Sequence, residues 1–595
     1  MKRGLFVTGS LVASLASCAT TEPVVEATTR PNVIVVLTDD QGIANLSCLG
    51  NEYIDTPNLD RFYEQSVRMT NFHVSPLSTP TRSAIISGRY PIRNGAWATF
   101  KGRDVLSSTS PTIADMFSEG GYSTALFGKW HLGDNYPSRP TDRGFDYAVQ
   151  HASGGVGELS DYWGNSYFDD TYLVNNEPTE FEGYCTDVWF AEAEKYMTQQ
   201  AAEDKPFFVY LATNAPHSPH YAPEEYIEPY KPLEEQGIIK DAGYYGQIKN
   251  IDDNFGLLDK FLTDSGLAEN TILIFMTDNG APPANNPWTM GYRGGKQSPL
   301  EGGHRVPFFV RWAAGGLAGG VDVDGLASHV DMMPTLAALC GIEFDEDKYV
   351  TDGIDFSDAL LRKGEIAKDR MVFIHHRQGP DAPFDVKGSV VLQDKWRLLS
   401  GDQLYDVVAE RGQKSNVAKA NSEVVETLRS ANEAFIADTK LLDEYQRFIP
   451  VAVIDPTKQR VATLTIQHAI GIDPGLWMPD QIAAGIKNRN NGYEIELTQD
   501  MKCKISIARW PRECPGKIWG VPAVNPKDMF EYTKITPESA RLKVDSNAAI
   551  SKSITADMSE VSYEVDLTAG RHYIETDFVN DGEAFGAYYI YVEAI

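Results

Sequence analysis

Nearly continuous apolar runs alternate with amphipathic stretches along the first half of the chain. The first run spans Asn32–Thr38 and contains no charged residue. Three further runs follow at residues 123–127, 207–212 and 271–276. Such runs are typical of parallel strands that are buried on both faces. From Tyr244 to Ser265, apolar residues recur every three or four positions, which predicts an amphipathic helix. The alternation predicts an α/β fold with a mostly parallel sheet flanked by helices.

The pattern changes after the α/β region. Short strand-like segments fill residues 371–400 and a helical segment spans 421–438, so we expect a small α+β subdomain over 371–443. Further on, alternating runs are interrupted by Gly, Pro, Asn and Asp, which is typical of antiparallel strands. We therefore predict an α/β domain over residues 31–370 and an appended β-sandwich over 444–595.

The first residues have the features of a bacterial lipoprotein signal. Lys2 and Arg3 precede a short, mostly apolar stretch, and Leu15-Ala16-Ser17-Cys18 resembles a lipoprotein cleavage site. We expect a signal peptide over residues 1–17, a lipid anchor on Cys18 and a tether over 18–30. The protein would then be exported and lipid-anchored in the bacterial cell envelope, in the periplasm or at the outer membrane. The alternative is a plain secretory signal in which Cys18 has no special role.

Charge and cysteine content limit the partners that the chain can have. The formal net charge of −30 disfavours nonspecific nucleic-acid binding, so we expect no nucleic-acid partner. An anionic substrate would need local positive charge. None of the cysteines has zinc-like spacing. Cys503 and Cys514 are close enough in sequence to form a disulfide in an oxidising compartment, and whether they pair stays open.

Acidic and amide side chains follow two of the predicted strands directly. Asp39 and Asp40 come after the first run, and Asp278 and Asn279 come after the run at 271–276. Each acidic pair alone has an ordinary explanation as a turn or a helix cap. However, the carboxyl ends of parallel strands meet at one edge of a sheet, where ligands bind. An all-oxygen set of this kind favours calcium or magnesium over zinc.

A third group of residues offers a nucleophile and anion-binding side chains. Ser78 precedes a proline that can begin a helix, and Arg82 lies one turn further on, where it can clamp an anion. Cations and histidines that can bind an oxyanion or move a proton follow other predicted strands and a glycine-rich loop. They are Lys129, His131, His217 and Lys296. Taken singly, each of these signals is weak.

Together these motifs resemble the type I, formylglycine-dependent sulfatases of the alkaline-phosphatase-like superfamily. The resemblance covers roughly residues 32–418. It rests on Ser78-x-Pro80-x-Arg82 with Ser87-Gly88-Arg89, Gly128-Lys129-Trp130-His131, Ala215-Pro216-His217, Thr277-Asp278-Asn279-Gly280, Glu301-Gly302-Gly303-x-Arg305-Val306-Pro307, Asp331-x-x-Pro334-Thr335-Leu336 and Leu404-Tyr405-Asp406. One departure is Thr81, where serine or alanine is more usual. The resemblance implies an alkaline-phosphatase-like α/β fold.

The resemblance also implies roles for the residues of the site. Asp39, Asp40, Asp278, Asn279 and the group at position 78 would hold a calcium ion. Ser78 would be converted to formylglycine, and a serine here resembles the bacterial type that is credited to a radical-based maturase. Sulfate would be bound by Arg82, Lys129 and Lys296. His131 would relay protons at the formylglycine, and His217 or Lys296 would protonate the leaving group.

The expected reaction is hydrolysis of a sulfate ester on a carbohydrate. Exported, tethered sulfatases of the serine type resemble enzymes that desulfate algal polysaccharides, so ulvan, carrageenan and fucoidan fragments are candidate substrates. The second possibility is a phosphatase or phosphonate-ester hydrolase with unmodified Ser78. Such relatives often use two metals with histidine ligands, and the sequence shows no second cluster of that kind. The third is a surface glycan-binding lipoprotein without activity, which the complete polar set disfavours.

Some aromatic and basic residues are candidates for contacts with the sugar. Trp163, Trp288 and Trp477 can stack on sugar rings, although packing in the core or in loops is the expectation for most of them. His375, His376 and Arg377 lie in the small subdomain, which borders the substrate pocket in this family. We expect some of these three to touch the sugar.

Overall fold

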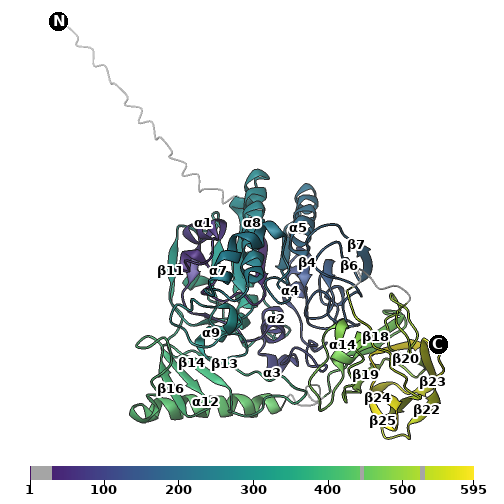
Figure 1. Ribbon diagram of the computed structural model, residues 1–595. Helices are drawn as coiled ribbons and strands as arrows, with labels where there is room; N and C mark the ends of the chain where they lie inside the picture. Colours follow the sequence, from purple (N-terminus) through teal and green to yellow (C-terminus); the bar gives the residue numbers. More distant parts are fainter. Residues whose placement is uncertain (2–29, 442–447, 523–528) are drawn as a thin grey trace.

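The computed structural model describes Met1 and residues 30–441, 448–522 and 529–595 (Figure 1). The predicted signal peptide, the lipid anchor on Cys18 and the tether lie outside the described residues, apart from Met1 and Arg30. None of the helices in the described ranges is long and apolar enough to cross a membrane.

A ten-stranded sheet forms the centre of the α/β domain, in the order β11-β2-β10-β9-β1-β8-β4-β5-β6-β7. The four middle strands all run parallel, which confirms the predicted fold class. They are β1 (Asn32–Thr38), β4 (Ser123–Lys129), β8 (Phe207–Ala212) and β9 (Thr271–Thr277). Antiparallel pairs occur toward the two edges. The outer strands are β2 (Val67–Met69), β5 (Tyr147–His151), β6 (Thr171–Val174), β7 (Glu177–Glu180), β10 (Phe308–Arg311) and β11 (Val321–Val323).

Helices cover both faces of this sheet, so alternate side chains of one strand enter different cores. Val33, Val35 and Leu37 of β1 pack on the face that carries the first set of helices, and Ile34 and Val36 pack on the other. The first set is α2 (Ser78–Ser87), α4 (Ile113–Glu119) and α10 (Met332–Cys340). The second set is α1 (Pro57–Gln65), α5 (Cys185–Ala202) and α8 (Ala242–Asp264). Burial on both faces explains why the strands read as unbroken apolar runs.

The small subdomain is an antiparallel sheet covered by one long helix. Its strands are β13 (Met371–Ile374), β14 (Val390–Gln393), β15 (Trp396–Leu399) and β16 (Gln403–Asp406). The helix, α12 (Ser422–Lys440), buries Val425 and Leu428 against β14, β15 and β16. This is the predicted α+β arrangement.

Beyond residue 448 the chain forms two further sheets that share one apolar core. The first contains β17 (Ala452–Ile454), β19 (Gly492–Leu497), β21 (Ser539–Val544), β22 (Ile550–Ser553), β24 (Gly570–Asn580) and β25 (Glu583–Gly586). The second contains β18 (Val461–Thr465), β20 (Met501–Ala508), β23 (Glu560–Leu567) and β26 (Tyr589–Ala594). Two sheets that face a common core match the predicted sandwich. Cys503 has a free thiol, so no disulfide joins it to Cys514 in this structure.

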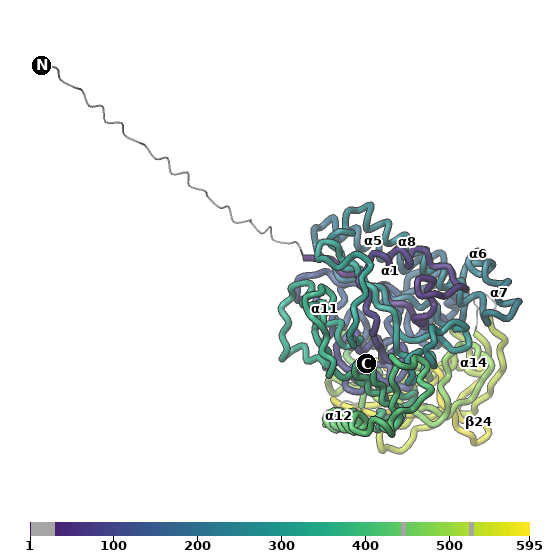
Figure 2. Tube along the Cα trace, turned by 90° about the vertical axis from the view of Figure 1, so that its left-hand side faces the viewer, coloured from purple at the N-terminus to yellow at the C-terminus, as the bar shows by residue number. Residues whose placement is uncertain are grey.

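The β-domain packs firmly against the α/β domain. Figures 1 and 2 place both C-terminal units at the end of the molecule opposite α5 and α8. Trp97, Leu159 and Trp163 of the α/β domain belong to the same apolar cluster as the interior of the β-domain. A buried ion pair between Arg103 Nη1 and Glu494 Oε2, at 2.7 Å, crosses the same boundary. The two domains therefore share a core.

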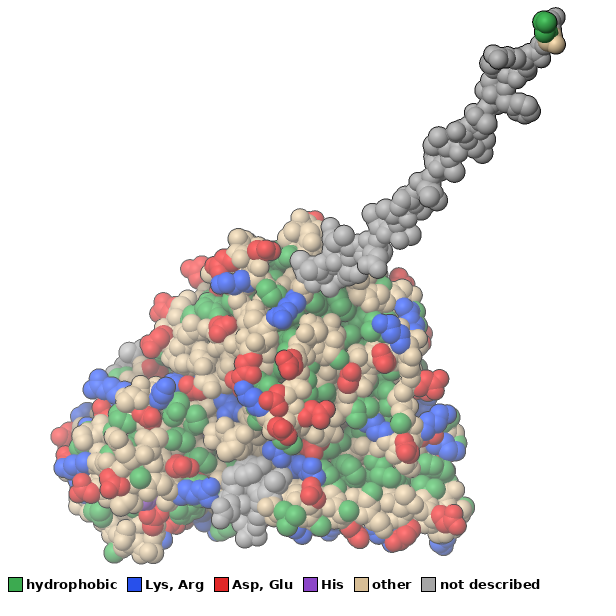
Figure 3. Space-filling model, turned by 180° about the vertical axis from the view of Figure 1, so that it is seen from behind, with side chains coloured by type: hydrophobic (Ala, Val, Ile, Leu, Met, Phe, Trp, Pro, Cys, Tyr) green, Lys and Arg blue, Asp and Glu red, His purple; other side chains and the backbone are tan. Residues whose placement is uncertain are grey.

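The negative charge of the chain is spread over its surface. On the face shown in Figure 3, aspartate and glutamate side chains are scattered among lysines and arginines. No single acidic patch covers that face. Because the net charge of the whole molecule repels an anionic substrate, positive side chains close to the binding site have to attract it.

Candidate active site

The four parallel strands deliver polar side chains to one edge of the sheet. Asp39 and Asp40 follow β1, Lys129 ends β4, and Asp278 follows β9. The loop after β8 carries His217. Neighbouring parallel strands end side by side, so residues from distant parts of the sequence meet here.

Helix α2 brings Ser78 to this edge. Its first residue is Ser78, whose Oγ donates hydrogen bonds to Asp39 Oδ1 at 2.9 Å and to Asn279 Oδ1 at 3.4 Å. The proline of the motif is the third residue of this helix. A proline in the first turn costs no hydrogen bond, because the N–H groups there have no partner within the helix. Thr81, the departure from the family pattern, is accommodated because its Oγ1 donates to Ser75 O at 2.9 Å.

Three cations balance three buried carboxylates around Ser78. The pairs are Arg82 with Asp278, Lys129 with Asp39, and Lys296 with Asp40. The Nη2–Oδ2 distance of the first pair is 2.9 Å, and the Nζ–Oδ2 distance of the last is 2.7 Å. Arg82, being 0 % exposed, also donates to the carbonyl oxygen of Lys129 at 3.2 Å. The site thus concentrates three cations in a molecule whose formal net charge is −30, with their charges matched by the three carboxylates.

The carboxylates are close enough together to hold a cation. Oxygen atoms of Asp39, Asp40 and Asp278 all lie within 4.8 Å of one another. Burial, and then the charge of Asp39, raise the pKa of Asp278 to about 7. Burial would raise the pKa of Asp39 as well, but Lys129 and other nearby cations hold it well below its usual value. A hard divalent cation suits these oxygens and would relieve their mutual repulsion, so the residues fit a calcium site.

His131 is placed to accept a proton. Its Nε2 donates to the carbonyl oxygen of Thr99 at 3.1 Å, which assigns the tautomer and leaves Nδ1 without a hydrogen-bond partner among the described residues. Burial, and then Lys129, lower the pKa of His131 well below its usual value, so the ring is neutral. Gly154 packs so closely on the ring that a Cβ at this position would lie 2.5 Å from Cε1. His131 is therefore held in one orientation.

His217 lies beside Asp40. Its Nδ1 donates to the carbonyl oxygen of Ser218 at 2.7 Å, and its Nε2 lies 3.8 Å from Asp40 Oδ2. Burial, and then Lys296, lower the pKa of His217. A proton on Nε2 is thus held weakly, which suits transfer to a leaving group.

A pocket of about 420 Å³ opens over Ser78. Its lining includes four more of the predicted residues: Lys129, His131, His217 and Lys296. The sequence did not point to Glu158 or Gln378, which also line it, since neither stands in a recognisable motif.

Of the three tryptophans that were candidates for contacts with the sugar, one lines the pocket and two do not. Trp477 lines the pocket, whereas Trp163 is buried in the core at 4 % exposure, and Trp288 is exposed outside the pocket. The segment 375–377 does not line the pocket, although the next residue, Gln378, does. The small subdomain therefore contributes Gln378 to the pocket, one position after the segment that we predicted.

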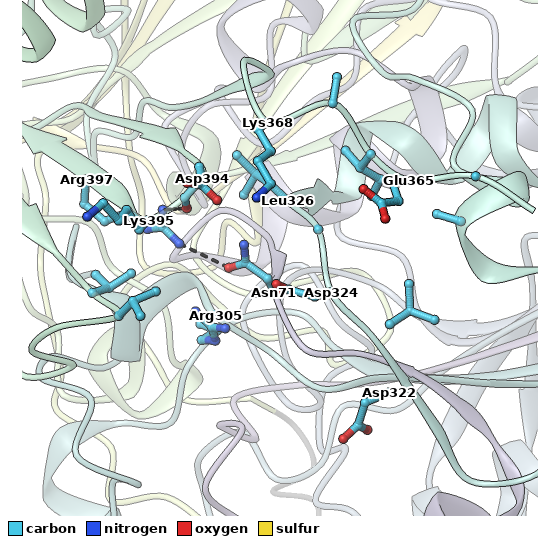
Figure 4. Close-up of a pocket in the computed structure, with 18 of the residues that line it drawn as sticks. Asn71, Arg305, Asp322, Asp324, Leu326, Glu365, Lys368, Asp394, Lys395 and Arg397 are labelled. Atoms are coloured by element: carbon cyan, nitrogen blue, oxygen red, sulfur yellow. Dashed lines mark hydrogen bonds between the residues drawn. The ribbon is translucent and has the colours of Figure 1, made fainter. Parts of the chain in front are cut away.

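A larger pocket of about 670 Å³ lies between the α/β domain and the small subdomain (Figure 4). Its walls carry charges of both signs, and no predicted catalytic residue lines it. Two of its arginines, the buried Arg397 and the partly buried Arg305, are already bound to Glu301. The pocket over Ser78 is thus the candidate active site, since five of the predicted residues line it and none lines the larger pocket.

Comparison with known proteins identifies relatives of the chain. A family model described as Sulfatase matches residues 31–342. The rat N-acetylgalactosamine-6-sulfatase is 29% identical over 369 residues, which cover 58% of this chain and 68% of that protein. An "Ulvan-active sulfatase" from Formosa agariphila is 30% identical over 371 residues, with the same coverage of both chains.

A solved structure extends the likeness to three dimensions. The crystal structure of "Ps i-CgsB in complex with k-i-k-neocarrahexaose" has a TM-score of 0.63 and 25% identity, and the match covers 70% of this chain and 94% of that chain. The family model's match, residues 31–342, includes all ten residues predicted for the site. The chain belongs to the sulfatase family and is a sulfuric ester hydrolase.

Proposed function

We propose that this protein removes sulfate from an algal sulfated polysaccharide, or from its oligosaccharides, through a formylglycine made from Ser78 and a bound calcium ion. The observation that carries the proposal is the convergence of three cations and three carboxylates around Ser78, which lines the pocket. The relatives that are named for ulvan and for a carrageenan oligosaccharide support the substrate class.

The residues of this chain divide the work of sulfate transfer. When present, the calcium ion and the hydrated formylglycine supply positive charge and a nucleophilic hydroxyl. Arg82, Lys129 and Lys296 stabilise the negative charge of the transferring group, and their rigid pairing limits reorganisation during the reaction. His217 gives a proton to the departing sugar oxygen, and the free Nδ1 of His131 accepts one from the group at position 78.

Two partners and a location complete the proposal. A serine-type maturase would oxidise Ser78, so activity would depend on a second enzyme. A lipid on Cys18 would tether the protein in the bacterial cell envelope, in the periplasm or at the outer membrane.

Co-expression with and without a serine-type maturase tests the proposal. We expect the peptide around Ser78 to lose two hydrogens by mass spectrometry only with the maturase, and sulfate release to follow that conversion. An unmodified serine in natively matured, active enzyme would overturn the formylglycine route. Phosphate or phosphonate ester turnover by that same enzyme would favour the alternative hydrolase.

A further inference from the structure

We infer that the appended β-domain completes the substrate pocket with Trp477, and that this pocket takes a neutral sugar whose only negative charge is the sulfate to be removed. The inference rests on the proposed sulfatase function and names the substrate class of that same site. It starts from the position of Trp477 and Met478, which belong to the β-domain yet line the pocket over Ser78.

Trp477 is held on several sides. Gln481 Oε1 accepts hydrogen bonds from the backbone nitrogens of Trp477 at 2.7 Å and Met478 at 3.0 Å. The carbonyl oxygen of Trp477 accepts from the backbone nitrogen of Leu159, in the α/β domain, at 2.8 Å. Its ring packs against Phe100, with centroids 4.6 Å apart. A fixed aromatic face at the mouth of a carbohydrate pocket suits stacking on the apolar face of a sugar ring.

The β-domain also fixes Glu158, which lines the same pocket. Oε2 of Glu158 accepts from Gln467 Nε2 of the β-domain at 2.8 Å, from Ser153 Oγ at 2.7 Å and from the Gly154 nitrogen at 3.2 Å. The other oxygen, Oε1, has no hydrogen-bond partner in the described part of the chain. It remains available to a hydroxyl group of a bound sugar.

The charges of the lining discriminate between sugars. Lys129 and Lys296 line the pocket with Ser78, and the rest of its lining contains no lysine or arginine. The lining also contains the carboxylate of Glu158 and the neutral amides of Gln297 and Gln378. A second sulfate or a uronate carboxylate would meet Glu158 without a compensating cation, which costs binding free energy. Hydroxyl groups would instead find acceptors and donors.

The test measures kcat/KM for sulfate release by enzyme with verified formylglycine. Substrates are monosulfated galactose, rhamnose and fucose, the matching disulfated sugars, a sulfated uronic acid, and 4-nitrophenyl sulfate. We expect a preference of about tenfold or more for monosulfated neutral sugars over the doubly charged ones. Trp477→Ala should lower kcat/KM on the best sugar about tenfold relative to turnover of the aryl sulfate.

Trp288→Ala is the matched control, since it removes an exposed tryptophan outside the pocket. It should leave both substrates unaffected. Glu158→Gln should raise the ratio of disulfated to monosulfated turnover. If Trp477→Ala unfolds, Trp477→Leu keeps the apolar volume and removes the aromatic face.

The outcomes separate this inference from the function on which it rests. Matured enzyme that releases no sulfate from any saccharide or aryl ester contradicts the proposed function itself. Enzyme that is active yet cleaves doubly charged sugars equally well, or is equally affected by the Trp477 and Trp288 substitutions, contradicts the inference alone.

Discussion

Two buried groups of metal-ligand-type side chains lie in the α/β domain, and they differ in what surrounds them. One is Asp39, Asp40 and Asp278; the other is His73, Glu301 and His304, and in both groups the ligand atoms lie within 4.8 Å of one another. The first group contacts Ser78 and Lys296, which line the pocket. The second, a histidine-containing group that the sequence did not reveal, is completely buried.

The second group is already satisfied by protein charges. Glu301 accepts from Arg397 Nε and from Arg305 Nη1, both at 2.7 Å. The two histidines bond to each other through Nδ1 at 2.9 Å. Burial lowers the pKa of His304 to about 4, so its ring stays neutral. With two arginines on one carboxylate, this group has an excess of positive charge and repels a cation. Closeness of ligand-type residues therefore does not by itself make a metal site; the surrounding charge and the access decide.

The largest expected effect comes from removing the hydroxyl group of Ser78, which contacts the first cluster. Ser78→Ala should reduce sulfate release by at least about 10³-fold, because no nucleophile remains at the carboxylates. The thermal midpoint should change little. Ser87→Ala, at the far end of the same helix, is the matched control and should stay active. Residual activity of Ser78→Ala near the wild-type value would show that the reaction centre lies elsewhere.

Chelation separates the two clusters directly. Treatment with EGTA should reduce sulfate release about 10²-fold or more and lower the thermal midpoint, and added Ca²⁺ should restore both. Glu301→Gln should respond in the same way, whereas Asp278→Asn should bind Ca²⁺ too weakly to respond, as calorimetry would show. If Glu301→Gln no longer responded to the chelator, the metal would belong to the second cluster, and our comparison would be wrong.

The second cluster should reveal itself through stability. Glu301→Gln leaves the buried Arg397 and the partly buried Arg305 without their carboxylate, and breaking a buried pair typically costs about 3–5 kcal/mol. Denaturant unfolding of the α/β domain measures this cost. Glu203→Gln removes an exposed glutamate and should cost less than about 0.5 kcal/mol. An equally small effect of Glu301→Gln would mean that the arginines find other partners.

The smallest expected effect concerns a group of two aspartates and a histidine at the boundary with the β-domain: Asp104, Asp134 and His468. Burial raises the pKa of Asp104 to about 6, and neighbouring Asp134 and Asp104 raise that of His468 against the effect of burial. Both groups bind protons more tightly in the folded state. The stability they contribute is therefore complete below about pH 4 and is lost as the pH rises through about 6 and then through the raised pKa of His468.

We expect the thermal midpoint to fall as the pH rises from about 4 through the raised pKa of His468. Asp104→Asn should flatten the part of this slope between about pH 4 and pH 6. The contribution of Asp104 is at most about 3 kcal/mol, since two pKa units correspond to that amount. Asp347→Asn, at an exposed position, should not alter the slope. A slope that is equally steep in Asp104→Asn would assign it to other groups.

Local patterns were sufficient to predict the parts of the molecule that depend on neighbours in sequence. Apolar runs gave the central strands, and the rule that ligands bind at the carboxyl ends of parallel strands brought Asp39 and Asp278 together before the structure did. The four-residue spacing of Ser78 and Arg82 placed both on one side of α2.

The remaining features depend on contacts between residues that are far apart in the chain. Glu158 is oriented by Gln467, 309 positions away, and no periodicity encodes such a pair. Similarly, Arg397 meets Glu301 only after the small subdomain has docked. The expectation for residues 375–377 missed Gln378 by one position, because loop geometry decides which side chain faces the pocket.

The core that the α/β domain and the β-domain hold in common has an evolutionary consequence. Trp97, Leu159 and Trp163 would be exposed to water if the chain ended near residue 443. Recombination therefore cannot exchange the β-domain as a module between relatives without repacking this boundary. A lineage of such enzymes would acquire new sugar preferences by point substitution around Trp477 and Gln467, gradually and in place.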